Sequence, residues 1–192
     1  LTLAGLPIPP WMQGRNILDP AYTPREAVFA ARDRCDETME HLRSVRTEHY
    51  KYIRNDLPQR PMLQPCVYKD SKAIVARLRE LHTAGTLPEL SERLLFAPTR
   101  PAEELYDLSK DPFETNNLAG DSAHQQTLLR LRKELTDWEE RTGDRGRLPE
   151  PEAMYDSDMA VYLQGNSGLP KERALELQRN IDLNKQWAAE GK

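Results

Sequence analysis

The sequence is poor in cysteine, in histidine and in long apolar runs, and each shortage argues against a class of function. Its two cysteines, Cys35 and Cys66, have no CxxC or Cys/His neighbourhood, so a zinc site is not expected. Buried free thiols are the first interpretation and a disulfide is the alternative. The four histidines are scattered without metal-ligand spacing. No apolar run is long enough to cross a bilayer, so we expect no membrane partner.

Excess positive charge and complete catalytic motifs are also missing. There are 27 Lys and Arg residues against 31 Asp and Glu residues, which gives a net charge of −4. Because binding to a phosphate backbone relies on clustered Lys and Arg, we expect no nucleic-acid partner. The sequence has no Gly-rich phosphate loop, no GxSxG and no HExxH. The residues alone therefore predict a structural or substrate-shaping α+β segment, not a self-sufficient catalyst.

The beginning of the chain, LTLAGLPIPP, resembles the end of a helix more than the start of a domain. Leu1, Leu3 and Leu6 have the spacing of an apolar helix face, and Gly5 is a suitable C-terminal stop. A domain rarely begins halfway along a buried helix. We therefore expect the 192 residues to be the C-terminal piece of a longer protein.

The apolar run at residues 27–31 leads directly into dense charge. The run is typical of a fully buried strand in a parallel or mixed sheet. Ligands of α/β proteins bind beyond the carboxyl ends of such strands, and Arg side chains match sulfate, phosphate and carboxylate oxygens. Arg32, Asp33 and Arg34 are therefore the candidate substrate-binding residues. The alternative is a solvated charged loop, which charge alone favours.

Three further stretches predict a small antiparallel sheet with a long helix packed on it. Residues 43–54 contain two β-favouring segments around Glu48 and His49, which is typical of a hairpin. Residues 103–118, EELYDLSKDPFETNNL, indicate a strand, a tight turn and the entry to a helix. Residues 121–141 follow with one apolar stripe, made of Leu128, Leu131, Leu135 and Trp138.

The remaining stretches predict further helices. Residues 69–84 have apolar spacing typical of a helix, and residues 148–164 favour a short one. Another begins after Pro170 and has a narrow apolar stripe. This last part either wraps the domain or contacts another subunit through residues 150–192.

Four of these motifs, in order, resemble the C-terminal region of sulfatases in the alkaline-phosphatase-like superfamily. LTLAGLPIPPWMQGRNIL is similar to the segment that closes their catalytic domain, and VFAARDRCDE to the strand and charged loop that follow. LRSVRTEHYKYIRN resembles their hairpin, and EELYDLSKDPFETNNLAGD their C-terminal signature. The resemblance covers residues 1–141 and is strongest to bacterial sulfatases related to heparan N-sulfatase.

The resemblance implies a parent enzyme that hydrolyses sulfate esters or sulfamates with a formylglycine and a calcium ion. The formylglycine comes from a C/S-x-P/A-x-R motif, which neither Cys35 nor Cys66 begins. No catalytic residue or metal ligand of the family therefore falls in this chain. The implied partners are the N-terminal catalytic part of the same protein and a sulfated carbohydrate. By analogy with bacterial sulfatases, the expected location is the periplasm or outside the cell.

The predicted fold is α+β in three parts. Residues 1–40 would end the catalytic domain and give one strand to its α/β sheet. Residues 41–141 would form the C-terminal subdomain, a small antiparallel sheet packed by a long helix. Residues 142–192 would be a helical tail of unknown role. The alternative functions are a non-catalytic module that binds a glycan or a partner, and a part of a related phospho- or phosphonate-ester hydrolase.

Overall fold

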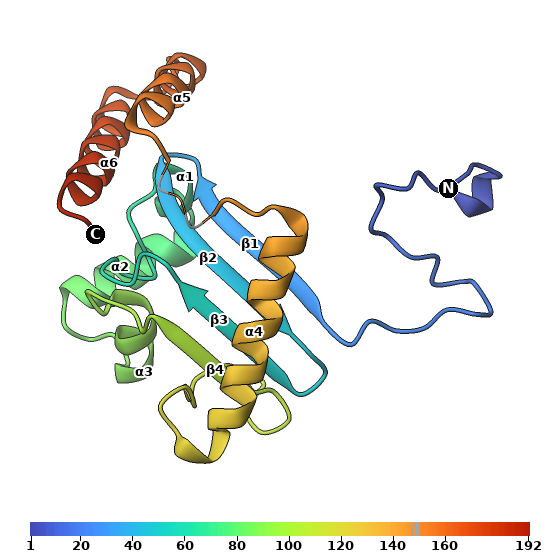
Figure 1. The fold of residues 1–192 in the computed structure, drawn as a ribbon. Helices are drawn as coiled ribbons and strands as arrows, with labels where there is room; N and C mark the ends of the chain where they lie inside the picture. Colours follow the sequence, from blue (N-terminus) through green and yellow to red (C-terminus); the bar gives the residue numbers. More distant parts are fainter. Residues whose placement is uncertain (147, 149) are drawn as a thin grey trace.

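The computed structural model describes residues 1–146, 148 and 150–192, and its centre is a four-stranded antiparallel sheet. The strands follow one another in the order β1-β2-β3-β4, so each pairs with its neighbour in sequence. Figure 1 shows the helix α4 lying across one face of this sheet. The strands are β1 (Val28–Cys35), β2 (Thr38–Arg46), β3 (Tyr50–Asn55) and β4 (Glu103–Asp107).

The helix α4 (Gln125–Thr142) packs as its apolar stripe predicted. The Asp121 side chain accepts a hydrogen bond from the Ala123 N–H at the short turn η3 (Ser122–His124), and Gly143 ends the helix at a φ of 65°. A left-handed residue at that position suits glycine because it has no Cβ to clash. The main core joins three sheet residues to three helix residues, namely Val45, Tyr52, Leu105, Leu128, Leu131 and Leu135.

The hairpin and the 103–118 stretch also form as predicted. β2 and β3 pair from Arg46↔Lys51 to Leu42↔Asn55, with the turn between them. The Asn117 side chain accepts hydrogen bonds from the Leu105 and Ala119 N–H groups, at 2.9 Å each. Asp111 accepts from the N–H groups of residues 115 and 116. The polar residues of this stretch therefore shape the turn and the entry to α4.

The prediction for residues 27–31 is wrong in two respects. The run begins β1, which pairs antiparallel with β2 from Val28↔Arg46 to Cys35↔Thr38 and leaves Val28 half exposed. The strand also continues through the three charged residues, which therefore lie in a strand and not in a loop. A run of five apolar residues cannot distinguish a buried central strand from an edge strand that covers a core on one face. Here Phe29 supplies that contact, stacked on Trp138 of α4 at 5.1 Å between ring centroids.

The domain boundary predicted between residues 40 and 41 falls inside β2, so residues 28–40 share the small sheet with the residues that follow. Before β1 the chain forms an extended arm that leads away from the sheet in Figure 1. Its one regular element is the 3₁₀ turn η1 (Thr2–Ala4), which ends at Gly5 with a φ of 69°. Leu3 and Trp11 on this arm are 84% and 77% exposed.

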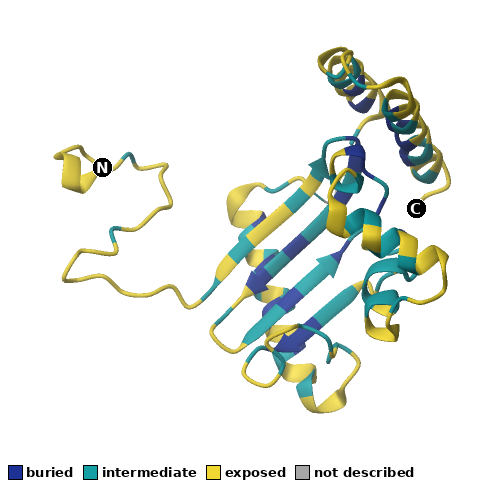
Figure 2. Cartoon of the chain, turned by 180° about the vertical axis from the view of Figure 1, so that it is seen from behind, coloured by how far each residue is buried: buried dark blue, intermediate teal, exposed yellow. Residues whose placement is uncertain are grey.

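A second, smaller core lies at the end of the sheet where β1 turns into β2. The tail helices α5 (Glu152–Gly165) and α6 (Lys171–Ala189) share this core with α1 (Val67–Asp70). The buried residues are Val67, Tyr155, Met159, Leu177 and Ile181. Figure 2 shows buried stretches on both tail helices.

The remaining helices between β3 and β4, which follow α1 in the chain, lie beside the sheet (Figure 1). They are α2 (Ala73–Thr83), the single turn α3 (Glu89–Ser91) and the π-helical turn η2 (Glu92–Phe96). In the described part of the chain, no helix has the length and apolar character needed to span a membrane.

Candidate functional site

The three candidate residues lie at an irregular point of β1. Arg32 pairs with Leu42 and Arg34 with Met39, so two residues of β2, Glu40 and His41, stand opposite Asp33 alone. An extra residue of this kind bends the strand and changes where the neighbouring side chains point. The three candidates consequently have different surroundings.

Asp33 is an exposed member of an ion-pair group that surrounds the buried Arg43. Its carboxylate lies 2.6 Å from Nη1 of Arg43, whose side chain is 1% exposed. Asp144, just beyond α4, binds the same guanidinium through Nε at 2.5 Å and Nη2 at 3.0 Å. These bonds lower the pKa of Asp144 below its ordinary value. A Cβ on Gly146 would lie 1.5 Å from Arg43 Nη2, so a side chain at this position would force the Arg43 guanidinium to move.

Arg34 is held by the tail. It forms an ion pair with Asp158 of α5, and Glu150 lies 3.6 Å from its Nη2. Its guanidinium carbon is 5.8 Å from the centre of the Tyr155 ring. Asp158 and Glu150 therefore already neutralise the positive charge of Arg34, which the sequence analysis had assigned to binding an anionic substrate.

Arg32 has a different environment. Its cross-strand partner Leu42 lies on the face of the sheet opposite α4, and cross-strand partners share a face. Among residues 1–146, 148 and 150–192, no ion pair to its side chain is found. The structure therefore separates the predicted trio into one unpaired arginine and two residues engaged in internal ion pairs.

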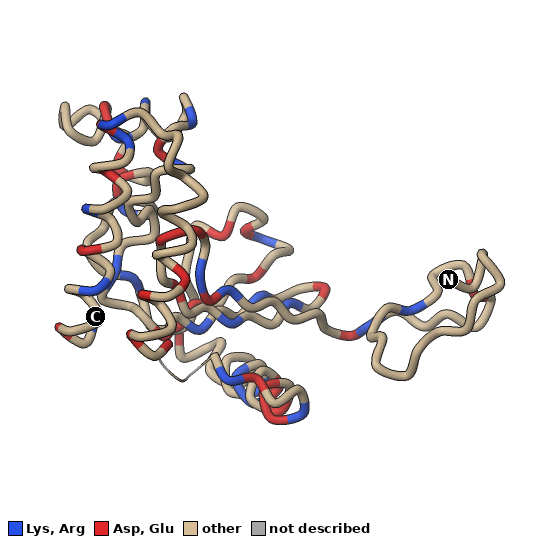
Figure 3. The backbone as a smooth tube through the Cα atoms, turned by 90° about the horizontal axis from the view of Figure 1, so that it is seen from above, with Lys and Arg blue, Asp and Glu red and all other residues tan. Residues whose placement is uncertain are grey.

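A groove of about 500 Å³ opens beside the bulge. β1 and β2 contribute Asp33, Arg34 and His41 to its walls, and the segment after α4 contributes Arg145, Glu150 and Met154. The lining mixes both signs of charge, as does the chain as a whole in Figure 3. The groove can form hydrogen bonds with a polar ligand, but Arg34 in its lining is already paired with Asp158.

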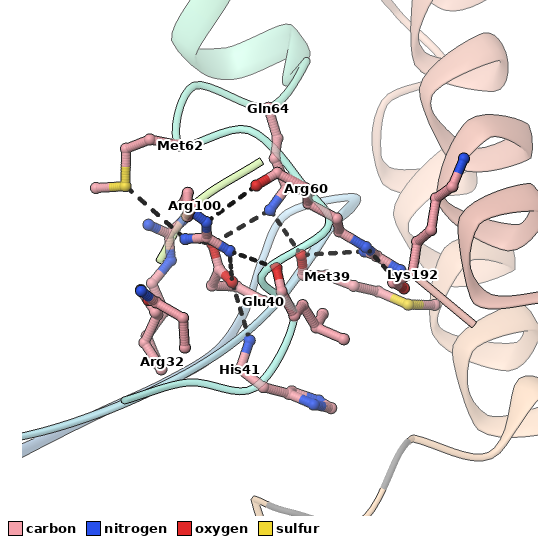
Figure 4. Close-up of polar contacts among 12 residues, drawn as sticks. Arg32, Met39, Glu40, His41, Arg60, Met62, Gln64, Arg100 and Lys192 are labelled. Atoms are coloured by element: carbon pink, nitrogen blue, oxygen red, sulfur yellow. Dashed lines mark hydrogen bonds and ion pairs between the residues drawn. The ribbon is translucent and has the colours of Figure 1, made fainter. Parts of the chain in front are cut away.

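Behind the bulge, a buried polar network fixes β2. Glu40 accepts hydrogen bonds from Arg100 at 2.7 and 3.0 Å and from Gln64 at 3.2 Å (Figure 4). Arg60 donates to Asn184 of α6 and to the backbone oxygen of Lys192. Buried charges are costly unless they are paired. This network therefore holds the segment after β3, which carries Arg60 and Gln64, in one arrangement with the sheet and the tail.

The turn between β1 and β2 brings together groups that the sequence did not connect. Asp36 has a φ of 53°, and ligand-type atoms of Asp36, Glu37 and Cys66 lie within 4.8 Å of one another. Glu37 is fully buried and accepts hydrogen bonds from the Val67 N–H at 2.7 Å and the Asn180 side chain at 2.9 Å. Sequence spacing gave no signal for this cluster, because Cys66 reaches the turn only through the fold.

Known sulfatases match this chain over much of its length. An ulvan-active sulfatase of Formosa agariphila is 37% identical over 146 residues, which is 75% of this chain and 24% of that protein. Human N-sulphoglucosamine sulphohydrolase is 32% identical over 118 residues, 61% of this chain and 23% of that protein. The chain thus spans about a quarter of the length of the curated relatives it matches.

A solved sulfatase structure has a fold similar to that of this chain. The solved structure of a 2-O GAG sulfatase matches 78% of this chain and 24% of its own length, with 21% identity and a TM-score of 0.50. No protein-family model matches the chain. The α+β class and the small antiparallel sheet are confirmed. About three quarters of the chain is therefore a C-terminal sulfatase region, as its four motifs predicted.

Proposed function

We propose that the chain is the C-terminal subdomain of a sulfatase that hydrolyses sulfate esters or sulfamates of a sulfated glycan. The observation that carries this proposal is the match to an ulvan-active sulfatase, which is 37% identical over 146 residues and covers 24% of that protein. That relative favours a sulfatase over a phospho- or phosphonate-ester hydrolase. Because polysaccharide substrates lie outside the cell, the parent enzyme would be periplasmic or secreted.

The formylglycine and calcium ion of the parent would belong to its N-terminal part. None of the 192 residues begins a C/S-x-P/A-x-R motif. The cluster of Asp36, Glu37 and Cys66 does not fit calcium, which prefers six to eight oxygen ligands and no thiol. The chain alone is therefore expected to lack sulfatase activity. Hydrolysis of an aryl sulfate by it, above a heat-killed sample, would contradict this.

The arm and the edge strand are the places where the catalytic part would join. The arm exposes large apolar side chains such as Leu3 and Trp11, which need a partner surface to be covered. β1 has no strand on its outer side among the described residues, so a strand of the catalytic sheet could pair with that edge. We accordingly propose that the subdomain comprises residues 28–146, with residues 150–192 as a tail that packs at the turn between β1 and β2.

Within this subdomain, Arg32 is the residue we propose to contact substrate, with Asp33 and Arg34 holding the bulge that presents it. In the full-length enzyme, Arg32→Ala should lower kcat/KM by about 10- to 100-fold, the value of one or two charge-assisted hydrogen bonds. Arg34→Ala should have a smaller effect because its charge is already paired. Arg46→Ala, an exposed arginine at the other end of β2, is the matched control.

Wild-type kcat/KM for both Arg32→Ala and Arg34→Ala would refute the proposed site without refuting the sulfatase assignment. The alternative of a non-catalytic glycan-binding module has its own test. Retention of the 192-residue chain on immobilised heparin, lost as salt rises, would support that alternative.

A further inference from the structure

The two cysteines, far apart in sequence, meet at the turn between β1 and β2. Cys35 ends β1 and pairs with Thr38, whose hydroxyl donates a hydrogen bond to the Pro65 carbonyl at 3.0 Å. Cross-strand partners project from the same face, so Cys35 faces the segment that carries Cys66. Both sulfur atoms lie 3.8 Å from the same oxygen, Oδ2 of Asp36.

We propose that Cys35 and Cys66 are a modification site, at which an external disulfide oxidises them to an intramolecular disulfide. The bond would tie the β1–β2 turn to the start of α1. It would close the loop that contains β2 and β3, next to the contacts that dock the tail. This inference does not depend on the proposed sulfatase function, because it concerns only the geometry of the two thiols.

A metal site is the competing use of these groups, and the hydrogen bonds argue against it. Glu37 Oε1 already accepts two hydrogen bonds, from the Val67 N–H and from Asn180. Binding a cation would require these bonds to be broken, whereas joining the thiols leaves them intact.

The reaction is a thiol–disulfide exchange in two steps. The partly exposed Cys35 loses its proton to solvent and attacks the external disulfide, which releases one thiol and leaves a mixed disulfide on Cys35. Cys66, whose thiol lies 3.8 Å from Asp36 Oδ2, then loses its proton to solvent, and its thiolate attacks the Cys35 sulfur, which releases the second thiol. The protein has lost two thiol hydrogens, and the oxidant has become two thiols. Burial raises the pKa of Cys66, so the second step should quicken as pH rises.

The test is to treat the 192-residue chain with oxidised glutathione in its native state and digest it with trypsin under non-reducing conditions. The peptides of residues 35–43 and 55–69 should be recovered as one covalent species, and the monomer should lose two hydrogen masses. Closing a loop of this size should raise Tm by about 5–10 °C relative to the reduced chain. Cys35→Ser and Cys66→Ser, treated identically, should show no such gain.

Three results would overturn the proposal. One is a native monomer that carries glutathione on each cysteine, and another is a disulfide-linked dimer as the main product. The third is tight equimolar binding of zinc that protects both thiols and is abolished by Glu37→Gln, which would make the cluster a metal site.

Discussion

The Arg43 ion-pair group gives the sharpest quantitative prediction. Arg43 is 1% exposed and is bound by two carboxylates, Asp144 at 14% exposure and Asp33 at 56%. Asp144→Asn should lower the free energy of unfolding by about 2–3 kcal/mol, because it removes two charge-assisted hydrogen bonds from a buried guanidinium. Asp33→Asn should cost less than about 1 kcal/mol, since an exposed ion pair is screened by water. Urea unfolding followed by circular dichroism at pH 7 measures both.

The pH dependence provides an independent check on the same group. Because Arg43 lowers the pKa of Asp144 in the folded state, the ion pair stabilises the protein fully above the ordinary carboxyl pKa of about 3.9. That contribution is lost as pH falls through the lower pKa of the folded state. The difference between wild type and Asp144→Asn should therefore shrink below about pH 4. An equal or larger loss for Asp33→Asn at pH 7, or a difference that does not change with pH, would refute the reasoning.

Two further substitutions test the two cores. Leu131→Ala in the α4 core should cost about 2–5 kcal/mol in urea unfolding, whereas Leu129→Ala, half exposed on the same helix, should cost less than about 0.5 kcal/mol. Equal losses would mean that α4 does not pack as described. Tyr155→Phe should cost about 1 kcal/mol, because the Tyr155 hydroxyl donates a 2.7 Å hydrogen bond to the buried Glu37 carbonyl. Tyr68→Phe, at an exposed tyrosine, is its control, and an unchanged stability for Tyr155→Phe would contradict the proposed docking of the tail.

Most of the fold that was predicted correctly follows from local sequence patterns. The stripe of Leu128, Leu131 and Leu135 specifies one face of a helix, and Gly143 ends that helix, so neither needs knowledge of the rest of the chain. The hairpin at residues 43–54 and the strand at Glu103–Asp107 are likewise set by alternation and by nearby turn residues. The order of four motifs was enough to identify a sulfatase region.

The arrangement of the candidate site could not be predicted in the same way. The charges of Asp33 and Arg34 are visible in the sequence, but their partners lie more than a hundred residues away or across a strand. The prediction that residues 27–31 form a fully buried strand of a parallel or mixed sheet failed for a related reason. Whether an apolar run is central or at an edge depends on which strands pair with it, and pairing is a property of the whole sheet.

The sequence by itself predicted most of the elements of this chain, their order and its resemblance to sulfatases. These follow from periodicity, capping and turn chemistry, all of which act over a few residues. Only the tertiary structure decided which charges are available to a ligand and which are already paired. It placed Cys66 beside Cys35 and left Arg32 without an ion pair among the described residues. The physical reason is that an ion pair or a thiol contact depends on distances of a few ångströms, which the folded chain sets and residue spacing does not.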